Sequence, residues 1–585
     1  MLKSVDRSTE NALFDRIDPT EMERHLDAFS GLTRVSGSAD EWKASEYIVD
    51  VLNKYGVTAE LHEFEGYISV PESGKLVVTS PTKRELDAIT VSFSASTSVA
   101  GTHADVVRVE SFDQSVAESR YLEGKIAFVQ EMPKPYIVRY AERAGVSGLI
   151  CQSPNEHRYQ GIVTPVWGTP STDTKKEIPD IPVVEINHPD GEWLAGRLEH
   201  GSVEATLKTE VTTELTNLPC PVGTIDGVKS DRYFLIGNHV DSWFEGITDN
   251  ATAMATTIEI ARIFAERNEP PRRGLKFGFW PGHSTGRYAG SAWYADTNWL
   301  DLRKNGVAYL HIDLPGLKGA DGLWYQHMAE LEDEHIHAME TATNIPIRKS
   351  DESYLRSTGR PARNSDQSFW GTGLSSLLSG ARLTPQTEAG GPVGGGWWWH
   401  TPEDTRDKVD IDVLVEETKL YVSLATRICE SVVLPHDYTA TVQDIRNTLV
   451  NIESNADDLV LFDDIHDDLD KLEELLERVR AEVNEYSEDT PPAAIADIEH
   501  LQVTLGNLLN PGLYMETAEH EHEPRRPFRQ LPYLRVAESL PELTGCDRRF
   551  AETKIQRGRM KLAHRVRKSI QETKTFLEIS PDRYE

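Results

Sequence analysis

Four residues of this sequence have side chains that commonly bind a divalent metal ion: His239, Asp249, Asp313 and His400. Two imidazoles and two carboxylates form a typical ligand set for zinc or a similar ion. Any one of them alone would more often have a structural role. Their joint occurrence beside apolar segments, in a consistent order, predicts a site for one or two ions of zinc or another divalent metal.

Two neighbouring elements position the first half of this set. The apolar run 233–236 predicts a buried strand of a parallel sheet. Such a strand would carry His239 and Asp241 to its C-terminal end, where open α/β sheets bind ligands. Residues 251–265 contain no Gly or Pro and show helical spacing of apolar side chains, so Asp249 lies just before a predicted helix.

The order of predicted elements divides the chain into four segments. Residues 1–67 begin with helices, residues 68–212 are β-rich with one or two helices, residues 213–436 alternate strands with helices, and residues 437–585 are helical. Strands that alternate with helices predict a mostly parallel sheet covered on both faces. We therefore predict an α/β fold, in which the first and third segments form a catalytic domain with a β-rich insertion, followed by a helical C-terminal domain.

The β-rich insertion contains three blocks in a characteristic order. They are the run 124–129, the segment 136–150 that ends a helix and enters a strand, and the strand 181–186. These blocks resemble the protease-associated domain. The resemblance implies a lid or a module that controls access of the substrate.

Six further blocks carry a resemblance that covers nearly the whole chain. They are residues 237–243, 249–250, 280–291, 311–313, 365–369 and 400–405. Together they resemble the co-catalytic zinc aminopeptidase and glutamate carboxypeptidase family. That family includes the transferrin receptor, which has the same insertion and a helical dimerisation domain.

The resemblance implies a role for individual residues. A carboxylate at Asp249 would bridge two zinc ions. One ion would also be held by His239 and Asp313, and the other by a Glu and His400. Asp241 matches the carboxylate that supports the metal-binding His, a role that fixes tautomer and basicity.

Asp366 and Asp404 also stand at family positions, where they would support the ligands. The sequence departs from the family where the family carries Gly-Glu-Glu. This chain reads Gly282-His283-Ser284, so it lacks both the Glu that serves as general base and the Glu that binds zinc. Three possibilities stay open for this half of the site.

In the first, His283 acts as the base near neutral pH, and in the second it binds metal together with Asp249 and His400. In the third, catalysis was lost. We favour an active metal enzyme in which His283 and Asp241 are catalytic and Ser284 is a supporting residue. The reason is that the other ligand-type residues and their supporting carboxylates are all present.

Basic and aromatic side chains near these blocks indicate the kind of substrate. Three basic residues fall in loops expected near the site: Arg287, Arg363 and Arg382. A guanidinium group suits a substrate carboxylate, although each Arg could equally form ion pairs with acidic residues of the protein itself. Trp243, Tyr288 and the run 397–399 could wall a small substrate pocket or simply pack under the Gly-rich stretch 390–396.

The composition restricts the partners of this protein. Lys and Arg number 61 against 95 Asp and Glu, a formal charge of −34, which opposes binding to nucleic acid or to an anionic membrane. The excess fits a solvated acidic shell, as in a halophilic proteome where salt screens self-repulsion. We expect a cytoplasmic location, since no segment resembles a secretion signal or a membrane span. The four widely spaced cysteines are expected to be isolated, mostly buried thiols.

Three other features have an ordinary explanation beside a functional one. Arg34 could take part in function but more often such an Arg ties a loop down. The tract 520–523, His-Glu-His-Glu, could bind metal, although an exposed charged turn is favoured. The acidic segment 445–486 and the basic segment 550–579 predict amphipathic helices that pair within one subunit or across a homodimer, and we expect a homodimer through this domain.

These observations predict a metal-dependent hydrolase of the zinc aminopeptidase type. It would cleave an amide bond of a small molecule or peptide, and the arginines favour a substrate that bears a carboxylate. One alternative is a lyase or hydratase on the same fold, in which a His base suits proton abstraction. The other is a non-catalytic binding protein of the transferrin receptor kind.

Overall fold

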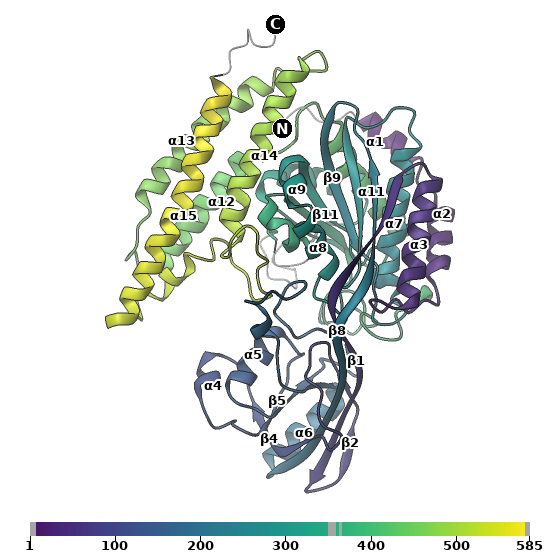
Figure 1. Cartoon of the computed structure of the whole chain (residues 1–585), viewed down its shortest axis with the longest axis vertical. Coiled ribbons are helices and arrows are strands. Elements are labelled where there is room, and N and C mark those ends of the chain that lie inside the picture. The colour runs from purple at the N-terminus through teal and green to yellow at the C-terminus, as the bar shows by residue number, and fades with distance from the viewer. Residues whose placement is uncertain (1–6, 349–358, 362–364, 579–585) are drawn as a thin grey trace.

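A computed structural model of the chain describes residues 7–348, 359–361 and 365–578. In these residues one sheet of thirteen strands runs through an α/β layer and a smaller β-rich module, and a helical unit lies beside the layer (Figure 1). The strand order is β12-β13-β11-β9-β10-β8-β4-β5-β6-β7-β3, with β1 paired to β8 and β2 paired to β1.

The middle of the α/β layer is parallel. Its strands are β9 (Ser230–His239), β10 (Arg273–Trp280), β11 (Gly306–His311) and β13 (Ser375–Arg382), and β12 (Gly322–His327) closes the edge antiparallel to β13. Strands β11 and β13 are buried along their whole length, as expected for a parallel sheet covered on both faces. The predicted α/β fold with a mostly parallel sheet is therefore confirmed.

Helices cover both faces of this layer (Figure 1). One face packs against α1 (Arg7–Phe14), α2 (Pro19–Phe29), α3 (Ala39–Lys54), α7 (Thr252–Ala265) and α11 (Ile411–Glu430). The other face packs against α8 (Ala289–Thr297) and α9 (Trp299–Asn305), while α10 (Glu332–Ala342) lies against α11 and β12. Helix α7 contacts both the sheet and the outer helices α2 and α3, which explains why it is buried on nearly all sides.

Two long strands connect the layer to the module. β1 (Thr58–Ser80) and β8 (Val203–Ile225) are antiparallel partners from Thr58 opposite Thr224 to Ser80 opposite Glu204. The predicted segment boundaries at residues 67 and 212 lie within these strands. The ribbon thus belongs to both units, because its hydrogen-bonded pairing continues from one to the other (Figure 1).

The module is a small sheet with helices around it. Its elements are β2 (Arg84–Leu86), β3 (Ala88–Thr90), β4 (Thr102–Val109), α4 (Gln114–Glu118), β5 (Ile126–Val129), α5 (Pro135–Arg143), β6 (Gly148–Gln152), β7 (Val183–Ile186) and α6 (His188–Glu199). It has two clusters of buried apolar side chains of its own. The blocks that resemble a protease-associated domain fall on β5, on α5 with β6, and on β7, and the assignment to that domain stays a prediction.

The helical unit consists of α12 (Tyr438–Asn455), α13 (Asp463–Val483), α14 (Pro492–Tyr514) and α15 (Gly545–Leu577). The acidic segment 445–486, which has no Pro or Gly, is not one helix. Asp457 and Asp458 have φ angles of 51° and 55°, a left-handed conformation that ends α12. Acidic α13 and basic α15 pair within the chain, for example through Asp468 and Arg567, 2.6 Å apart.

The remaining sequence predictions concern thiols and membrane spans. Cys151, Cys220 and Cys429 are buried and Cys546 is exposed, and none of the four is in a disulfide. The expectation of isolated, mostly buried thiols is confirmed. In the described part of the chain, no helix combines the length and the apolar character that crossing a membrane would require.

Candidate metal centre

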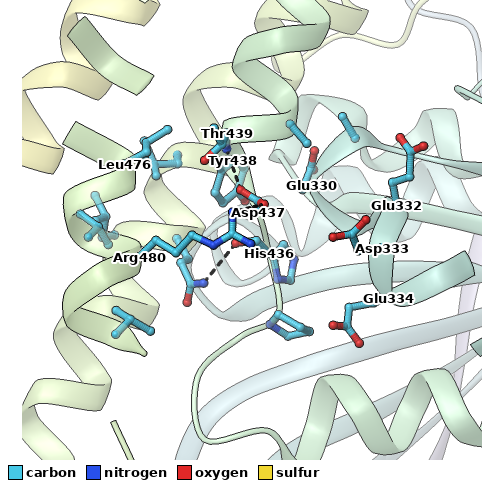
Figure 2. Close-up of a pocket in the computed structure, with 18 of the residues that line it drawn as sticks. Glu330, Glu332, Asp333, Glu334, His436, Asp437, Tyr438, Thr439, Leu476 and Arg480 are labelled. Carbon is cyan, nitrogen blue, oxygen red and sulfur yellow. Dashed lines mark hydrogen bonds and ion pairs between the residues drawn. The ribbon is translucent and has the colours of Figure 1, made fainter. Parts of the chain in front are cut away.

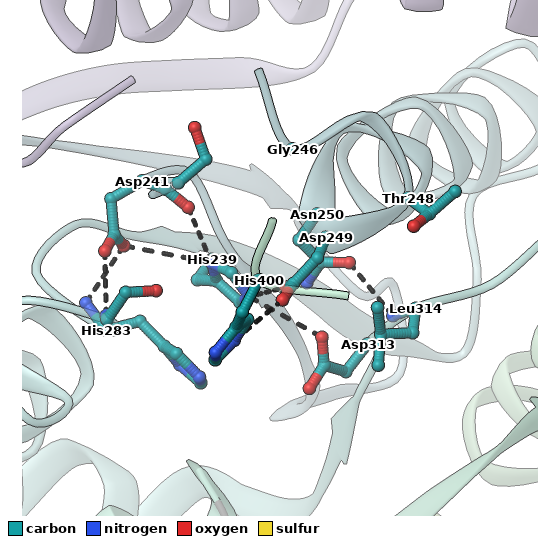
Figure 3. A network of polar contacts seen from close by, with 12 residues as sticks. His239, Asp241, Gly246, Thr248, Asp249, Asn250, His283, Asp313, Leu314 and His400 are labelled. Carbon is teal, nitrogen blue, oxygen red and sulfur yellow. Dashed lines mark hydrogen bonds and ion pairs between the residues drawn. The ribbon is translucent and has the colours of Figure 1, made fainter. Parts of the chain in front are cut away.

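The predicted metal ligands meet at the C-terminal ends of β9 and β11 (Figure 3). His239 is the last residue of β9, Asp313 follows β11 by two residues, and Asp249 lies in the π-helical turn Ile247–Ala251 that enters α7. Gly246 permits this turn. Its φ is 56°, and a Cβ atom there would lie 2.5 Å from the carbonyl oxygen of Asp249.

Asp249 faces two imidazoles with its two carboxylate oxygens. Its Oδ1 lies 3.0 Å from Nε2 of His239, and its Oδ2 lies 3.1 Å from Nε2 of His400. The same Nε2 of His239 is 3.5 Å from Oδ1 of Asp313. One carboxylate therefore stands between two nitrogen donors, an arrangement suited to two cations that share a carboxylate ligand.

Burial and neighbouring charge oppose each other in this cluster. Burial lowers the pKa of His239, but hydrogen bonds to Asp249 and Asp313 outweigh it and hold that pKa well above its usual value. Burial raises the pKa of each Asp, and the imidazoles outweigh it and lower both pKa values. The site thus holds two ionised carboxylates, buried Asp249 and partly exposed Asp313, which a cation would stabilise.

Asp241 links the two halves of the site. Its carbonyl oxygen accepts a hydrogen bond from Nδ1 of His239 at 2.9 Å, so Nε2 is the nitrogen that faces Asp249. Its carboxylate accepts the backbone N–H of His283 at 2.9 Å and of Ser284 at 2.8 Å. Asp241 and Ser284 therefore position the 282–284 loop, and the catalytic role predicted for Asp241 is a positioning one in this geometry.

His283 packs face to face against His239. Their ring centroids are 4.0 Å apart with 13° between the planes, and Tyr288 meets His283 edge-on. Burial and the charge of His239 lower the pKa of His283 well below its usual value, so its ring is neutral and carries a lone pair. Within the described residues, His239, His283 and Asp313 are the group of potential metal ligands whose donor atoms all lie within 4.8 Å of one another.

This position differs from one of the two expected roles of His283, as a ligand together with Asp249 and His400. The ring lies on the side of His239 and Asp313 instead. The cause is the anchoring of its backbone by Asp241, which follows β9 by two residues.

The module contributes to the environment of His400. Nδ1 of His400 donates to the carbonyl oxygen of Gln160 at 2.6 Å, which leaves Nε2 facing Asp249. The imidazole stacks on Trp399, with ring centroids 3.6 Å apart. The ring of Trp243 lies in an edge-to-face arrangement with it, with centroids 5.9 Å apart. A residue of the module thus sets the tautomer of a predicted metal ligand.

The donor set fits a divalent metal ion. Oδ1 of Asp313 is buried, and the donor nearest to it is Nε2 of His239 at 3.5 Å, which lies closer to Asp249. A buried, ionised oxygen with only one long contact to a donor is unfavourable, and a metal ion would stabilise it. Imidazole nitrogens and carboxylate oxygens together suit zinc and related ions.

Two further carboxylates were predicted to support the ligands. Asp404 accepts the backbone N–H groups of Thr248 and Asp249 at 2.9 and 3.0 Å, and burial raises its pKa to about 7. It therefore fixes the turn that presents Asp249. Asp366 is buried and accepts a hydrogen bond from Nε1 of Trp370 at 2.9 Å.

Two of the arginines predicted to bind a substrate carboxylate donate hydrogen bonds to backbone carbonyl groups instead. Arg287 donates to two carbonyl oxygens of the module, 2.6 and 3.1 Å away. Arg382 donates to the carbonyl of Asp313 at 2.8 Å, and both side chains are buried. Because buried carbonyl groups need donors, this geometry gives the two arginines a structural role instead. Arg363 lies outside the described residues.

The aromatic side chains predicted to wall a pocket surround the site in part. Tyr288 stacks on Trp167 of the module, with centroids 4.0 Å apart. Trp243 lines a small cavity of about 10 Å³ that adjoins Asp249 and His400. The module and the aromatic side chains therefore leave little space beside the metal ligands in this conformation.

Sequence reasoning left two residues out of the site. Arg34 is fully buried and donates to the carbonyls of Val240, Glu245 and Gly246 at 2.8 to 2.9 Å, so it ties down the loop between His239 and Asp249. This confirms the expectation that Arg34 ties a loop down. His311 lies parallel to His283, 6.0 Å between centroids, and its Nε2 is 3.7 Å from Oδ2 of Asp313. Its signal in the sequence is its place at the end of a buried strand.

The tract 520–523 has structural contacts. Glu523 is buried and accepts the backbone N–H of Glu516 at 2.8 Å, while His522 pairs with Asp296 at 2.9 Å. In the described residues it forms no group of three potential metal ligands. The tract is thus a charged turn, as favoured, with one buried member.

The structure has an α/β fold with a cluster of possible metal ligands at the ends of parallel strands. Residues 222–425 match the model of peptidase family M28, so the chain carries an M28 peptidase domain. Among curated proteins, it is 30% identical to the mouse (Mus musculus) aminopeptidase NAALADL1 over 131 residues, 22% of this chain and 17% of that protein.

Two other relatives match over segments of different length. The chain is 30% identical to a Caenorhabditis briggsae glutamate carboxypeptidase 2 homolog over 209 residues, 34% of this chain and 24% of that protein. It is 31% identical to chicken (Gallus gallus) transferrin receptor protein 1 over 100 residues, 16% of this chain and 13% of that protein. The matches span less than a quarter of these relatives' own lengths.

Solved structures agree on the fold. An aminopeptidase from Aneurinibacillus sp. strain AM-1 has a TM-score of 0.55 at 22% identity, covering 72% of this chain and 96% of its own. A zinc aminopeptidase from Bacillus subtilis has a TM-score of 0.52 at 20% identity, covering 71% and 96%. At these identities the likeness shows the fold alone, and with the family match it supports a metal-dependent peptidase.

Proposed function

We propose that this protein is a metal-dependent hydrolase of the aminopeptidase type that cleaves an amide bond of a small substrate. The observation that carries the proposal is the position of Asp249 between the Nε2 atoms of His239 and His400. Two imidazoles that share one carboxylate form a preorganised site for two cations. A protein with a purely structural role has no need to bring these groups together in its interior.

The proposed ligands are His239, Asp313 and Asp249 for one ion, and Asp249 and His400 for the other. Zinc or a similar ion bound there would polarise the substrate carbonyl and lower the pKa of water. His283 lies against His239, so its imidazole is placed beside the proposed ligands, where it can accept the proton of the attacking water. Alternatively, it completes the ligand set of His239 and Asp313.

Metal content and amide hydrolysis test the main proposal together. We expect the purified protein to hold stoichiometric zinc or another divalent ion by mass spectrometry, and to hydrolyse aminoacyl 4-nitroanilides or dipeptides. Asp249→Asn should lose both properties. The matched control is Asp231→Asn, an exposed residue at the opposite end of β9. A protein without metal at any salt concentration would exclude every enzyme hypothesis, and metal without amide hydrolysis would favour a lyase or hydratase.

We also propose that the protein is a cytoplasmic homodimer whose contact lies on the helical unit. Five exposed large apolar side chains belong to this unit: Val450, Leu459, Leu461, Phe550 and Met560. Exposed apolar groups favour burial in a protein interface. Light scattering of the wild type and of Phe550→Glu with Met560→Glu would test this, since the variant is expected to be monomeric.

A further inference from the structure

A second cavity lies between the α/β layer and the helical unit (Figure 2). Its volume is about 300 Å³, at the lower end of small-molecule sites. The start of α10, residues 435–437, the start of α12, and helices α13 and α14 surround it. None of the proposed metal ligands lines this cavity, so it is separate from the metal centre.

The two walls of the cavity differ in character. Helices α13 and α14 supply apolar side chains: Leu476, Val479, Val483, Ile498, Leu501 and Leu505. The opposite wall supplies carboxylates: Glu330, Glu332, Asp333, Glu334 and Asp437. One basic side chain, Arg480, is among the described lining residues, and it pairs with Asp437 at 3.2 Å. Figure 2 shows the glutamates on one side and Leu476 on the other.

Part of this acidic wall has an ordinary explanation. Glu332, Asp333 and Glu334 occupy the first turn of α10, where carboxylates interact favourably with the helix N-terminus. Glu334 also pairs with Arg427, and Glu332 with Arg360. The carboxylates alone therefore do not indicate a ligand.

Two buried hydrogen-bond acceptors in the wall have no donor. Nε2 of His436 donates to the carbonyl of Val307 at 3.0 Å, and burial lowers the pKa of His436 to about 4. Its ring is neutral, and the lone pair of Nδ1 accepts no hydrogen bond. Nε2 of Gln502 donates to the carbonyl of Leu434 at 2.7 Å, which leaves Oε1 as a second acceptor without a partner.

Both residues also line a smaller neighbouring pocket, and a ligand that donates hydrogen bonds would satisfy the two acceptors. A metal ion does not fit, because the described carboxylates and imidazoles of this cavity form no group close enough to share one. An organic cation with N–H groups would donate hydrogen bonds to the two acceptors and balance the negative charge of the carboxylates. An apolar chain on the same molecule would pack against the apolar side chains of α13 and α14.

We propose that this cavity binds a small amphiphilic organic cation of the primary alkylammonium class. Its ammonium group lies by His436, Gln502 and Asp437, and its chain packs on α13 and α14. The occupant contacts both the α/β layer and the helical unit, so binding stiffens their junction.

Calorimetric titration of the full-length protein with octylammonium tests the proposal. We expect one molecule per chain, bound at least tenfold more tightly than octyltrimethylammonium, which lacks N–H donors, and than octanoate, which has the opposite charge. Equal binding of octyltrimethylammonium or octanoate would overturn the proposal.

Three variants show whether the probe occupies this cavity rather than the acidic surface. Val479→Phe fills the cavity, and Asp437→Asn removes a charge while it keeps an N-cap for α12. Each is expected to weaken octylammonium binding at least fivefold. Asp467→Asn, an exposed change on the same helix α13, should leave binding unchanged. Unchanged binding to both Val479→Phe and Asp437→Asn would refute the site.

Discussion

The carboxylate of Asp241 accepts the backbone N–H of His283 at 2.9 Å, so a residue that follows β9 holds the 282–284 loop, where the sequence departs from the expected Gly-Glu-Glu. The backbone carbonyl oxygen of Asp241 also accepts a hydrogen bond from Nδ1 of His239. The intact half of the metal centre and the altered half therefore share one anchor. A change at Asp241 is expected to disturb both.

Asp241→Asn should lower kcat/KM about 10- to 100-fold without unfolding the protein. An amide can accept only one of the two N–H groups that the carboxylate accepts, and its NH2 group meets the other N–H. The 282–284 loop would then shift away from the ligands. Steady-state kinetics with metal analysis measures the effect, and Asp231→Asn at the far end of β9 is the control. Full activity in Asp241→Asn would contradict the anchoring role.

His283→Ala should lower kcat by about 100-fold or more, because it removes the imidazole that can accept the proton of the attacking water. The metal content of the variant distinguishes the two roles. A base leaves the content unchanged, and a ligand lowers it. His283→Glu restores a carboxylate at this position and is expected to regain part of the hydrolysis. Wild-type activity in His283→Ala would exclude both roles.

Arg34→Met should destabilise the protein by at least about 3 kcal/mol, because three carbonyl groups, two of them buried, lose their donor. The free energy of unfolding is measured by urea titration. The control is Arg24→Met, which removes a half-exposed ion pair to Glu21 and should change stability by less than about 1 kcal/mol. Equal effects of the two substitutions would show that the loop does not depend on Arg34.

His335 should make stability depend on pH. It is fully buried beside His327 and Ser379, and burial lowers its pKa from 6.5 to about 3. The unfolded chain takes up the proton first, so this contribution is complete above pH 6.5 and falls by about 1.4 kcal/mol per unit as pH drops toward 3.

The measurement is urea unfolding of the wild type and of His335→Phe between pH 7.5 and 4.5. The difference in stability between the two proteins should shift in favour of the variant as pH falls. His103→Gln, an exposed position, is the control and should follow the wild type. A constant difference across this range would show that His335 is protonated in the folded protein.

Elements with a strong local pattern could be predicted from the sequence. The apolar run 233–236 lies in β9, and the Gly- and Pro-free segment before residue 265 is α7, because burial on both sides leaves a continuous apolar signal. The break between α12 and α13 could not be predicted from the sequence, because it depends on the left-handed backbone of Asp457 and Asp458 in a segment of uniform composition.

The roles of charged side chains were the least predictable part of the site. Arg287 and Arg382 have the charge that a substrate carboxylate needs, yet both donate to backbone carbonyls. Which acceptor an Arg meets depends on chain segments that are distant in sequence. The orientation of His283 depends in the same way on Asp241, 42 positions earlier.

The sequence by itself determined the α/β fold class and the residue types of the candidate metal centre, because strand periodicity and ligand chemistry are local properties. Only the tertiary structure decided that Asp249 stands between His239 and His400, that Gln160 of the module sets the tautomer of His400, and that His283 lies on the side of Asp313. These relations join segments up to 240 residues apart. They arise from the packing of the sheet, the module and the loops, which no local pattern of residues encodes.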